Sequence, residues 1–190
     1  KAAISRAFSD AAASYDQIAQ LQRRVAARTI ELQRLENMRV CDIGCGTGFC
    51  IEALLDNGCE VLGLDIAPGM LRVAEQKFGN RASYLCADFD RAPFAEHQPF
   101  DAYVSSMSLQ WSENLAYTLS HLSQFLIRGG TVQFATLAQN TLHELRDAWS
   151  AVDSYVHINQ FESVSTILDQ VKAAGLEVLS HRVETETLEY

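Results

Sequence analysis

Three glycines at alternate positions form the clearest chemical pattern of the sequence: Gly44, Gly46 and Gly48, within the segment DIGCGTG. The apolar residues 40–43 lead into them and favour a short buried strand. Glycine lets a backbone turn sharply and approach a ligand where any Cβ would clash, and the N-terminus of the next helix lies behind such a loop. The segment therefore predicts a ligand site after the first strand.

Acidic residues follow the next two predicted strands. Asp65 ends the second strand, 21 positions after Gly44, where its carboxylate can accept hydrogen bonds from ribose hydroxyls. Asp88 lies in the turn at residues 87–89, after the third strand. A dinucleotide-binding loop would read GxGxxG, but Phe49 takes the place of its last glycine. The observed spacing therefore disfavours an NAD-dependent enzyme.

The rest of the sequence alternates between strand and helix patterns. Residues 2–36 are rich in Ala, Leu, Gln and Arg and predict a helix with a break near Ser9, Asp10 and Ser14. Further helices are expected at 49–57, 68–78, 114–127 (ended by Gly129 and Gly130), 142–152 and 164–174. Strands are expected at 40–43, 60–65, 83–87, 100–105, 131–137 and 176–188. This alternation predicts βαβ units, and hence a three-layer, doubly wound, mostly parallel Rossmann-like α/β fold.

Composition and charge narrow the possible functions. The 190 residues are 48% apolar or aromatic and suit one folded domain. The net charge is -9, which argues against a nucleic-acid or anionic-membrane surface, although residues 1–39 carry seven basic and four acidic groups. Five cysteines without zinc-site spacing predict reduced thiols. With no apolar stretch of membrane-spanning length and no signal-peptide pattern in KAAISRAFSD, we expect a cytoplasmic protein.

The glycine loop and the two acidic strand ends, taken in order, resemble class I S-adenosylmethionine-dependent methyltransferases. The resemblance implies that the loop glycines face the methionine part of the cofactor, that Asp65 binds the ribose diol, and that Asp88 binds the adenine amine. Asp42 would brace the loop or reach the cofactor's amino group. The complete implied cofactor set is Asp42, Gly44, Cys45, Gly46, Gly48, Asp65, Ile66, Met70, Asp88, Phe89 and Ser105.

Three further stretches, residues 7–26, 105–115 and 136–161, are similar to the malonyl-acyl carrier protein O-methyltransferases of biotin synthesis. That family ends in a further helix and an antiparallel strand, which are not evident in this sequence. The resemblance implies a single domain with a helical lid at 1–36, a cofactor-binding core at 38–138, and substrate-side helices with a late strand at 139–190. It also implies transfer of a methyl group to the free carboxylate of a malonyl thioester.

Such a carboxylate is already ionised at neutral pH, so no general base is expected, and positioning dominates the chemistry. No metal is expected either, because the cysteines lack the spacing of a zinc site. The candidate positioning residues are Tyr15, Gln110, Trp111 and His157, and Gln139 and Arg146 are weaker candidates. Acyl carrier proteins are acidic, so Arg23, Arg24 and Arg28 are candidates for carrier binding, and malonyl-coenzyme A is a second possible substrate.

Two alternatives remain open at the level of the sequence. One is a methyltransferase of the same fold that acts on another small acid, such as trans-aconitate, or on a quinone precursor. The other is a module that binds S-adenosylmethionine without catalysis. Fold alone separates none of these from the malonyl thioester reaction.

Overall fold

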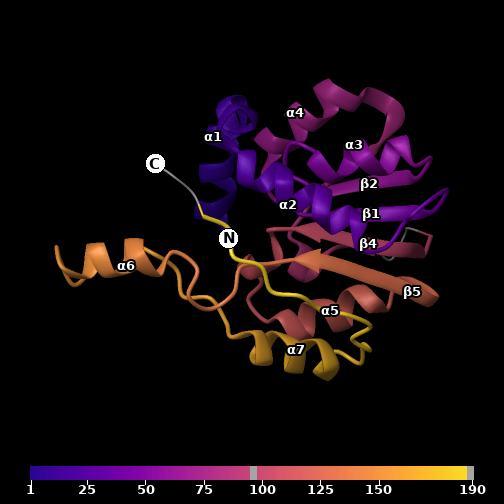
Figure 1. Cartoon of the computed structure of the whole chain (residues 1–190). Coiled ribbons are helices and arrows are strands. Elements are labelled where there is room, and N and C mark those ends of the chain that lie inside the picture. The colour runs from indigo at the N-terminus through magenta and orange to yellow at the C-terminus, as the bar shows by residue number, and fades with distance from the viewer. Residues whose placement is uncertain (95–97, 188–190) are drawn as a thin grey trace.

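A parallel β-sheet forms the centre of the computed structural model, which describes residues 1–94 and 98–187 (Figure 1). Within these residues the sheet has five strands in the order β3-β2-β1-β4-β5, and every neighbouring pair is parallel. The strands are β1 (Arg39–Ile43), β2 (Glu60–Asp65), β3 (Ser83–Cys86), β4 (Phe100–Ser106) and β5 (Leu126–Ala135). The predicted α/β fold is confirmed.

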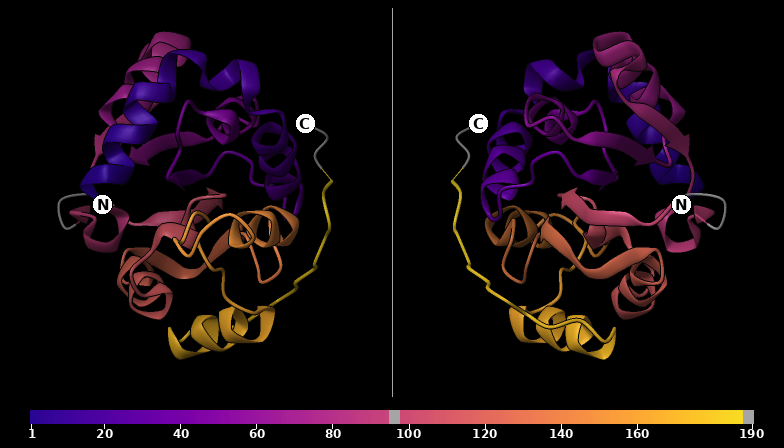
Figure 2. Two further views of the ribbon diagram at one scale, coloured as in Figure 1. Left: turned by 90° about the vertical axis from the view of Figure 1, so that its left-hand side faces the viewer. Right: turned by 90° about the vertical axis from the view of Figure 1, so that its right-hand side faces the viewer.

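Helices cover both faces of the sheet, as Figure 2 shows. They are α1 (Ala2–Ile18), α2 (Gln20–Glu31), α3 (Phe49–Asp56), α4 (Pro68–Phe78), α5 (Leu115–Ser123), α6 (His143–Ser150) and α7 (Val164–Ala173). One hydrophobic cluster joins α2, α3 and α4 to one sheet face, and a second joins α5 and α7 to the other. Helix α6 projects from the body of the molecule (Figure 1).

The order of the strands places a crevice at the end of β1. This strand pairs with β2 on one side and with β4 on the other, so the chain reverses its direction of winding there. In doubly wound sheets, ligands bind outside the carboxyl ends of the strands at this switch point. The glycine loop begins at that point, because Gly44 directly follows β1.

The long N-terminal helix is interrupted at a different place from the one expected. Helices α1 and α2 meet at the buried Ala19, whose φ of -83° and ψ of 44° are not helical. The polar residues expected to break the helix have other roles: the Ser9 hydroxyl accepts a hydrogen bond from Gly69 N, and the Ser14 hydroxyl donates to Ala11 O. Helix α2 also ends at Glu31, earlier than expected.

The segment between α5 and β5 also differs from the prediction. Helix α5 ends at Ser123, and β5 begins at Leu126, so Gly129 and Gly130 lie inside the strand instead of ending a helix. The pairing of β4 with β5 shifts register in this part of the strand, and Gly129 has a φ of +83°. Glycine accommodates such an irregularity without the steric cost of a side chain.

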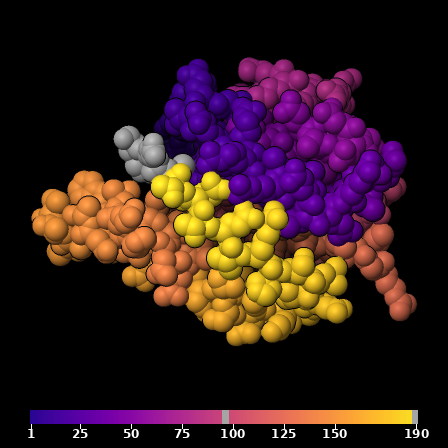
Figure 3. Space-filling model, viewed as in Figure 1, coloured from indigo at the N-terminus to yellow at the C-terminus, as the bar shows by residue number. Residues whose placement is uncertain are grey.

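The strand predicted for residues 176–188 is wrong over its described part. Residues 176–187 form no strand, and Leu188 lies outside the described residues. Leu176 and Val178 pack against the cluster of α5 and α7, and the chain then crosses the surface towards α2 (Figure 3). The alternating pattern of apolar residues reflects this packing on one side. A strand also needs a neighbouring strand to hydrogen-bond with its backbone, and the described sheet provides none here.

A core substitution tests the packing of α3 on the sheet. Leu54 is fully buried, whereas Leu179 is 76% exposed, so Leu→Ala removes the same atoms from two different environments. We expect Leu54→Ala to lower the free energy of unfolding by about 2–5 kcal/mol, because buried apolar area is lost and a cavity remains. Leu179→Ala should change it by less than about 0.5 kcal/mol. Urea denaturation measures both, and equal effects would contradict the assigned core.

Candidate active site

A cavity of about 250 Å³ lies at the carboxyl ends of the central strands, under helix α1. Its walls come from the glycine loop, the ends of β2 and β3, the segment after β4, and the inner faces of α1 and α2. The structure brings these predicted site residues together there: Tyr15, Asp42, Gly44, Cys45, Gly46, Asp65, Ile66, Met70, Asp88, Phe89, Gln110 and Trp111. Segments distant in the sequence thus form one site.

Asp65 holds the glycine loop against the end of β2. Its carboxylate accepts one hydrogen bond from Gly46 N at 2.8 Å and another from Ala67 N at 2.7 Å. Burial raises the pKa of Asp65, and the backbone hydrogen bonds act in the opposite direction. The carboxylate lines the cavity and keeps lone pairs that could accept from the hydroxyls of a ligand.

Gly44 is required by close packing. It has a φ of +70°, and a Cβ placed on it would lie 2.3 Å from the Cβ of Ser108. A Cβ on Gly46, which has a φ of +54°, would meet no atom within 4 Å, so the space above this residue is open. Gly46 therefore leaves its backbone accessible to a ligand in the cavity.

Asp42 supplies a buried acceptor that has no partner among the described residues. Its Oδ2 atom is buried without a hydrogen bond, although the residue lines the cavity. Burial and the nearby charge of Asp65 raise the pKa of Asp42 to about 8. A buried unpaired acceptor is costly, so a cationic group of a ligand would complete this site. The chemistry of Asp42, Asp65 and the open glycine loop therefore fits a ligand with an ammonium group and a ribose, such as S-adenosylmethionine.

Residues after β2 and β3 form the far end of the cavity. Ile66 and the buried Met70 contribute apolar surface, while Asp88 and Phe89 follow β3 in a short turn. Asp88 is partly exposed and Phe89 is buried, so this end offers one acceptor beside an aromatic ring. The pair suits a flat heteroaromatic group that carries a hydrogen-bond donor.

Aromatic side chains link α1 to the loops below it. Tyr15 stacks on Phe49 with ring centroids 6.3 Å apart, and Phe8 contacts both Tyr15 and Trp111 edge to face. Burial, followed by the charges of Asp65 and Asp16, raises the pKa of Tyr15, so its hydroxyl stays protonated and can donate a hydrogen bond. Helix α1 therefore places a neutral donor next to the glycine loop.

Gln110 is held in one orientation on the opposite wall. Its Nε2 donates to Met107 O at 2.7 Å, and its Oε1 accepts from the Thr136 hydroxyl at 3.3 Å. Met107 has a φ of 54°, which is unusual for a residue with a side chain. One amide proton of Gln110 remains available to a ligand, since Nε2 carries two protons and one of them is donated to Met107.

Two residues of the implied cofactor set do not line the cavity. Gly48 begins α3 with a φ of +94°, and a Cβ there would lie 2.5 Å from the Phe78 ring, so close packing explains this glycine. Ser105 is buried and donates to Ile43 O at 2.9 Å. Its neighbours Ser106 and Ser108 line the cavity instead.

The candidates in the third family-specific stretch also lie outside the cavity wall. His157 stacks on Trp149 with centroids 4.2 Å apart and lies 2.8 Å from Asp153, so these residues form a cluster of their own after α6. Gln139 N donates to Glu162 O, and Arg146 donates to Thr141 O. Among the described residues of β5 and of the stretch 136–161, only Leu137 lines the cavity.

The three arginines proposed for carrier binding lie along α2 and have partners within the chain. Arg23 stacks over the Phe49 ring at 4.4 Å. Arg24 forms an ion pair with Glu186 at 2.9 Å, and Arg28 forms ion pairs with Glu184 and Glu186. Acidic residues of the segment after α7 therefore already neutralise part of this basic surface.

Several residues of the cavity wall were missed by sequence reasoning. They are Lys1, Ile4, Phe8, Gln22, Ala26, Thr47, Phe49, Cys50, Ser106, Met107, Ser108 and Leu137. Thr47 was detectable because it lies within the glycine loop, where it donates to Asp16 at 2.5 Å. Lys1 belongs to no motif, and its place in the cavity wall becomes visible only when α1 folds over the sheet.

Metal-binding clusters and membrane-spanning helices are two further features that the described residues do not provide. Within this part of the chain, no group of three or more His, Cys, Asp or Glu residues could hold a metal ion. Among the helices of residues 1–94 and 98–187, none is long and apolar enough to cross a membrane.

Replacing Asp65 tests its assignment to the ligand site. We expect Asp65→Ala to weaken binding of S-adenosylhomocysteine roughly 10- to 100-fold, because charge-assisted hydrogen bonds contribute about 1.5–3 kcal/mol each. Asp56→Ala is the matched control, since the Asp56 side chain is 72% exposed and lies outside the cavity. Isothermal titration calorimetry measures both variants, and an unchanged dissociation constant for Asp65→Ala would refute the assignment.

The pKa of Asp42 predicts a pH dependence of ligand affinity. Below about pH 8 the free protein holds a proton on Asp42, which a cationic ligand must displace, so affinity increases as pH rises towards that value. We expect up to about a tenfold increase per pH unit between pH 6 and 8, followed by a plateau. The slope should be smaller in Asp42→Asn, whereas titration of the ligand's own amine affects both proteins equally. Calorimetry with S-adenosylhomocysteine that gave equal slopes would contradict the prediction.

Comparison with known proteins agrees with this geometry. A family model described as "Methyltransferase domain" matches residues 41–134, from β1 into β5. A chain in the solved complex between the Haloferax volcanii Trm112 methyltransferase activator and a methyltransferase is similar in fold, with a TM-score of 0.76 and 24% identity. That match covers 91% of this chain and 77% of the other, and it shows that the two chains share a fold.

Two curated relatives extend the likeness over the whole chain. The biotin biosynthesis bifunctional protein BioHC of Cellvibrio japonicus is 37% identical over 99% of this chain, which spans only 38% of that relative's length. The malonyl-[acyl-carrier protein] O-methyltransferase of Serratia marcescens is 37% identical over 100% of this chain and 73% of its own length. The chain therefore belongs to the malonyl-[acyl-carrier protein] O-methyltransferase family, within the class I S-adenosylmethionine-dependent methyltransferases.

Proposed function

We propose that this protein methylates the free carboxylate of a malonyl thioester, with S-adenosylmethionine as the methyl donor, at the start of biotin synthesis. The observation that carries the proposal is the 37% identity, over the whole chain, to a relative named for the malonyl-carrier reaction. The cavity supports it, because cofactor-type residues line one wall and neutral hydrogen-bond donors line the other.

The cofactor wall suits a cationic ligand. When bound, S-adenosylmethionine supplies an activated methyl group on a positively charged sulfur. Asp42 and Asp65 are buried next to the glycine loop, and Asp88 lies at the far end of the cavity. The negative charge of Asp65 and Asp88 would favour the cation, and Asp42 would lose its proton when the cation binds. Gly46 would let the ligand approach the backbone. The residues of this wall bind and orient the donor.

The acceptor wall suits an ionised carboxylate. The Tyr15 hydroxyl, the free amide proton of Gln110 and the indole of Trp111 are neutral donors on residues that line the cavity. A carboxylic acid with a pKa near 4 has lost its proton at neutral pH, so the wall has to orient the acceptor and exclude water without removing a proton. Neutral donors achieve this without trapping the carboxylate in a strong ion pair.

The carrier protein is the proposed source of the malonyl group. An acidic carrier could bind along α2 by replacing the contacts of Arg24 and Arg28 with Glu186 and Glu184, which are solvent-accessible ion pairs. Such exposed pairs are weak, so exchange would cost little. We further propose that the protein works in the cytoplasm, where its unpaired cysteines stay reduced.

Mass spectrometry of the methylated product tests the proposal. We expect malonyl-acyl carrier protein, incubated with the enzyme and S-adenosylmethionine, to gain one methyl group that is released by saponification. Acetyl-carrier protein is the matched control because it lacks the free carboxylate. Malonyl-coenzyme A, trans-aconitate and a quinone precursor run in parallel distinguish the alternatives. If only another acid were methylated, the malonyl thioester would not be the substrate. Cofactor binding without any methylated product would favour a non-catalytic module.

A further inference from the structure

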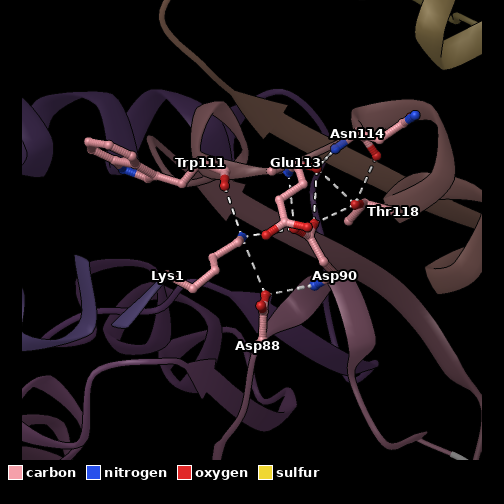
Figure 4. Close-up of polar contacts among 8 residues, drawn as sticks. Lys1, Asp88, Asp90, Trp111, Glu113, Asn114 and Thr118 are labelled. Carbon is pink, nitrogen blue, oxygen red and sulfur yellow. Dashed lines mark hydrogen bonds and ion pairs between the residues drawn. The ribbon is translucent and has the colours of Figure 1, made fainter. Parts of the chain in front are cut away.

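Lys1 is a partly buried cation at the start of helix α1, with its side chain only 17% exposed. Figure 4 shows its ammonium group between two carboxylates and a backbone carbonyl. The Nζ atom lies 2.8 Å from Asp90 Oδ2 and 3.3 Å from Asp88 Oδ1, and it donates to Trp111 O at 2.9 Å. Lys1 thereby connects α1 to two loops that are distant in the sequence.

Asp90 extends this contact into the loop that follows β4. Its carboxylate also accepts hydrogen bonds from the Thr118 hydroxyl at 2.5 Å, from the Ser112 hydroxyl at 2.9 Å and from Glu113 N at 3.0 Å. Burial acts to raise the pKa of Asp90, but the hydrogen bonds from Lys1 and these donors outweigh it and lower the pKa. The carboxylate therefore stays charged and ties residues 112–118 to the turn after β3.

Asp88 is left with one oxygen available to a ligand. Its Oδ1 atom accepts from Asp90 N at 3.1 Å and pairs with Lys1, whereas its Oδ2 atom makes no hydrogen bond with any described residue. The Lys1 ammonium also lies 4.5 Å from the centre of the Phe89 ring, which lines the same end of the cavity. The Lys1 ammonium thus contacts both the Asp88 carboxylate and the Phe89 ring at this end of the cavity.

We propose that Lys1 is a positioning residue that closes α1 over the cavity and couples the cofactor end of the site to the loop carrying Gln110 and Trp111. This inference rests on the proposed function, because it assigns Asp88 to the cofactor and Trp111 to the acceptor wall. Lys1 touches neither reacting group. It acts by holding Asp88, Asp90 and the Trp111 carbonyl in one arrangement.

The other attachments of α1 do not reach the loop after β4 through a charged group. The Ser5 hydroxyl donates to Ile66 O at 2.8 Å, and Asp16 forms an ion pair with Lys77 next to the glycine loop. Phe8 contacts the Trp111 ring only through an aromatic edge. Among the described residues of α1 and its N-terminal cap, Lys1 alone makes an ion pair with the turn after β3.

Three variants of the full chain separate positioning from general stability. Lys1→Met keeps the length and apolar stem of the side chain but removes its charge, and Lys1→Arg keeps the charge. Arg6→Met is the matched control, because Arg6 is exposed on α1 and forms no ion pair with any described residue. Hydrogen exchange of the cofactor-free protein and calorimetry with S-adenosylhomocysteine provide readouts that need no catalysis.

The expected result is local. Lys1→Met should increase exchange about tenfold in both residues 2–10 and residues 112–118, and should weaken S-adenosylhomocysteine binding about tenfold, since charge-assisted hydrogen bonds are lost. Exchange in β1 should not change, Lys1→Arg should stay within about threefold of wild type, and Arg6→Met should match wild type. In turnover assays the KM of both substrates should rise more than kcat falls.

Several outcomes would overturn the proposal. Unchanged exchange in residues 112–118 would remove the coupling, and faster exchange throughout the chain would show a purely structural role. Tighter ligand binding in Lys1→Met would show that Lys1 competes with the ligand for Asp88. Failure of the proposed function would look different. If the wild-type protein did not methylate a malonyl thioester, the exchange and binding measurements on these variants could still give the expected result.

Discussion

The site depends on the carboxylate of Asp65 and the two backbone amides that it binds. By accepting from Gly46 N and Ala67 N, this side chain joins the loop after β1 to the start of the segment after β2. It does so where β1 separates the two halves of the sheet, so the loop is fixed at the mouth of the crevice. The attachment also holds the open backbone of Gly46 against the cavity.

The charges around the cavity form a consistent pattern. Asp42, Asp65 and Asp88 line the donor side, and Lys1, the one basic residue of the described wall, is already paired with Asp88 and Asp90. Under the proposed function, a cationic methyl donor would be attracted to this side, while an anionic acceptor would meet neutral hydrogen-bond donors. The raised pKa of Asp42 is part of the same pattern, because a carboxyl group buried near another carboxylate is neutral until a cation arrives.

Helix α1 is both a wall of the site and its cover. Its apolar face packs Ala12 against Ala67 and Met70, while its ends are fastened by polar contacts near the glycine loop and near the turn after β3. A Cβ on Gly69 would lie 2.6 Å from the backbone of Ser9, so α1 and α4 are in close contact. Helix α1 is therefore fastened along its length to the segments that surround the cavity.

The sequence by itself determined the parallel α/β fold, the position of the glycine loop and the acidic strand ends, because these depend on local periodicity and on residues close together in the chain. Gly44, Asp42, Asp65 and Asp88, which this pattern singled out, all line the cavity. Only the tertiary structure decided that Ser105 is buried behind the site, that His157 packs on Trp149, and that residues 176–187 form no strand. It also decided the place of Lys1, since contacts between residues 1, 88, 90 and 111 arise only when α1 folds across the sheet. Such contacts depend on the shape of the whole fold, and no spacing within one segment can encode them.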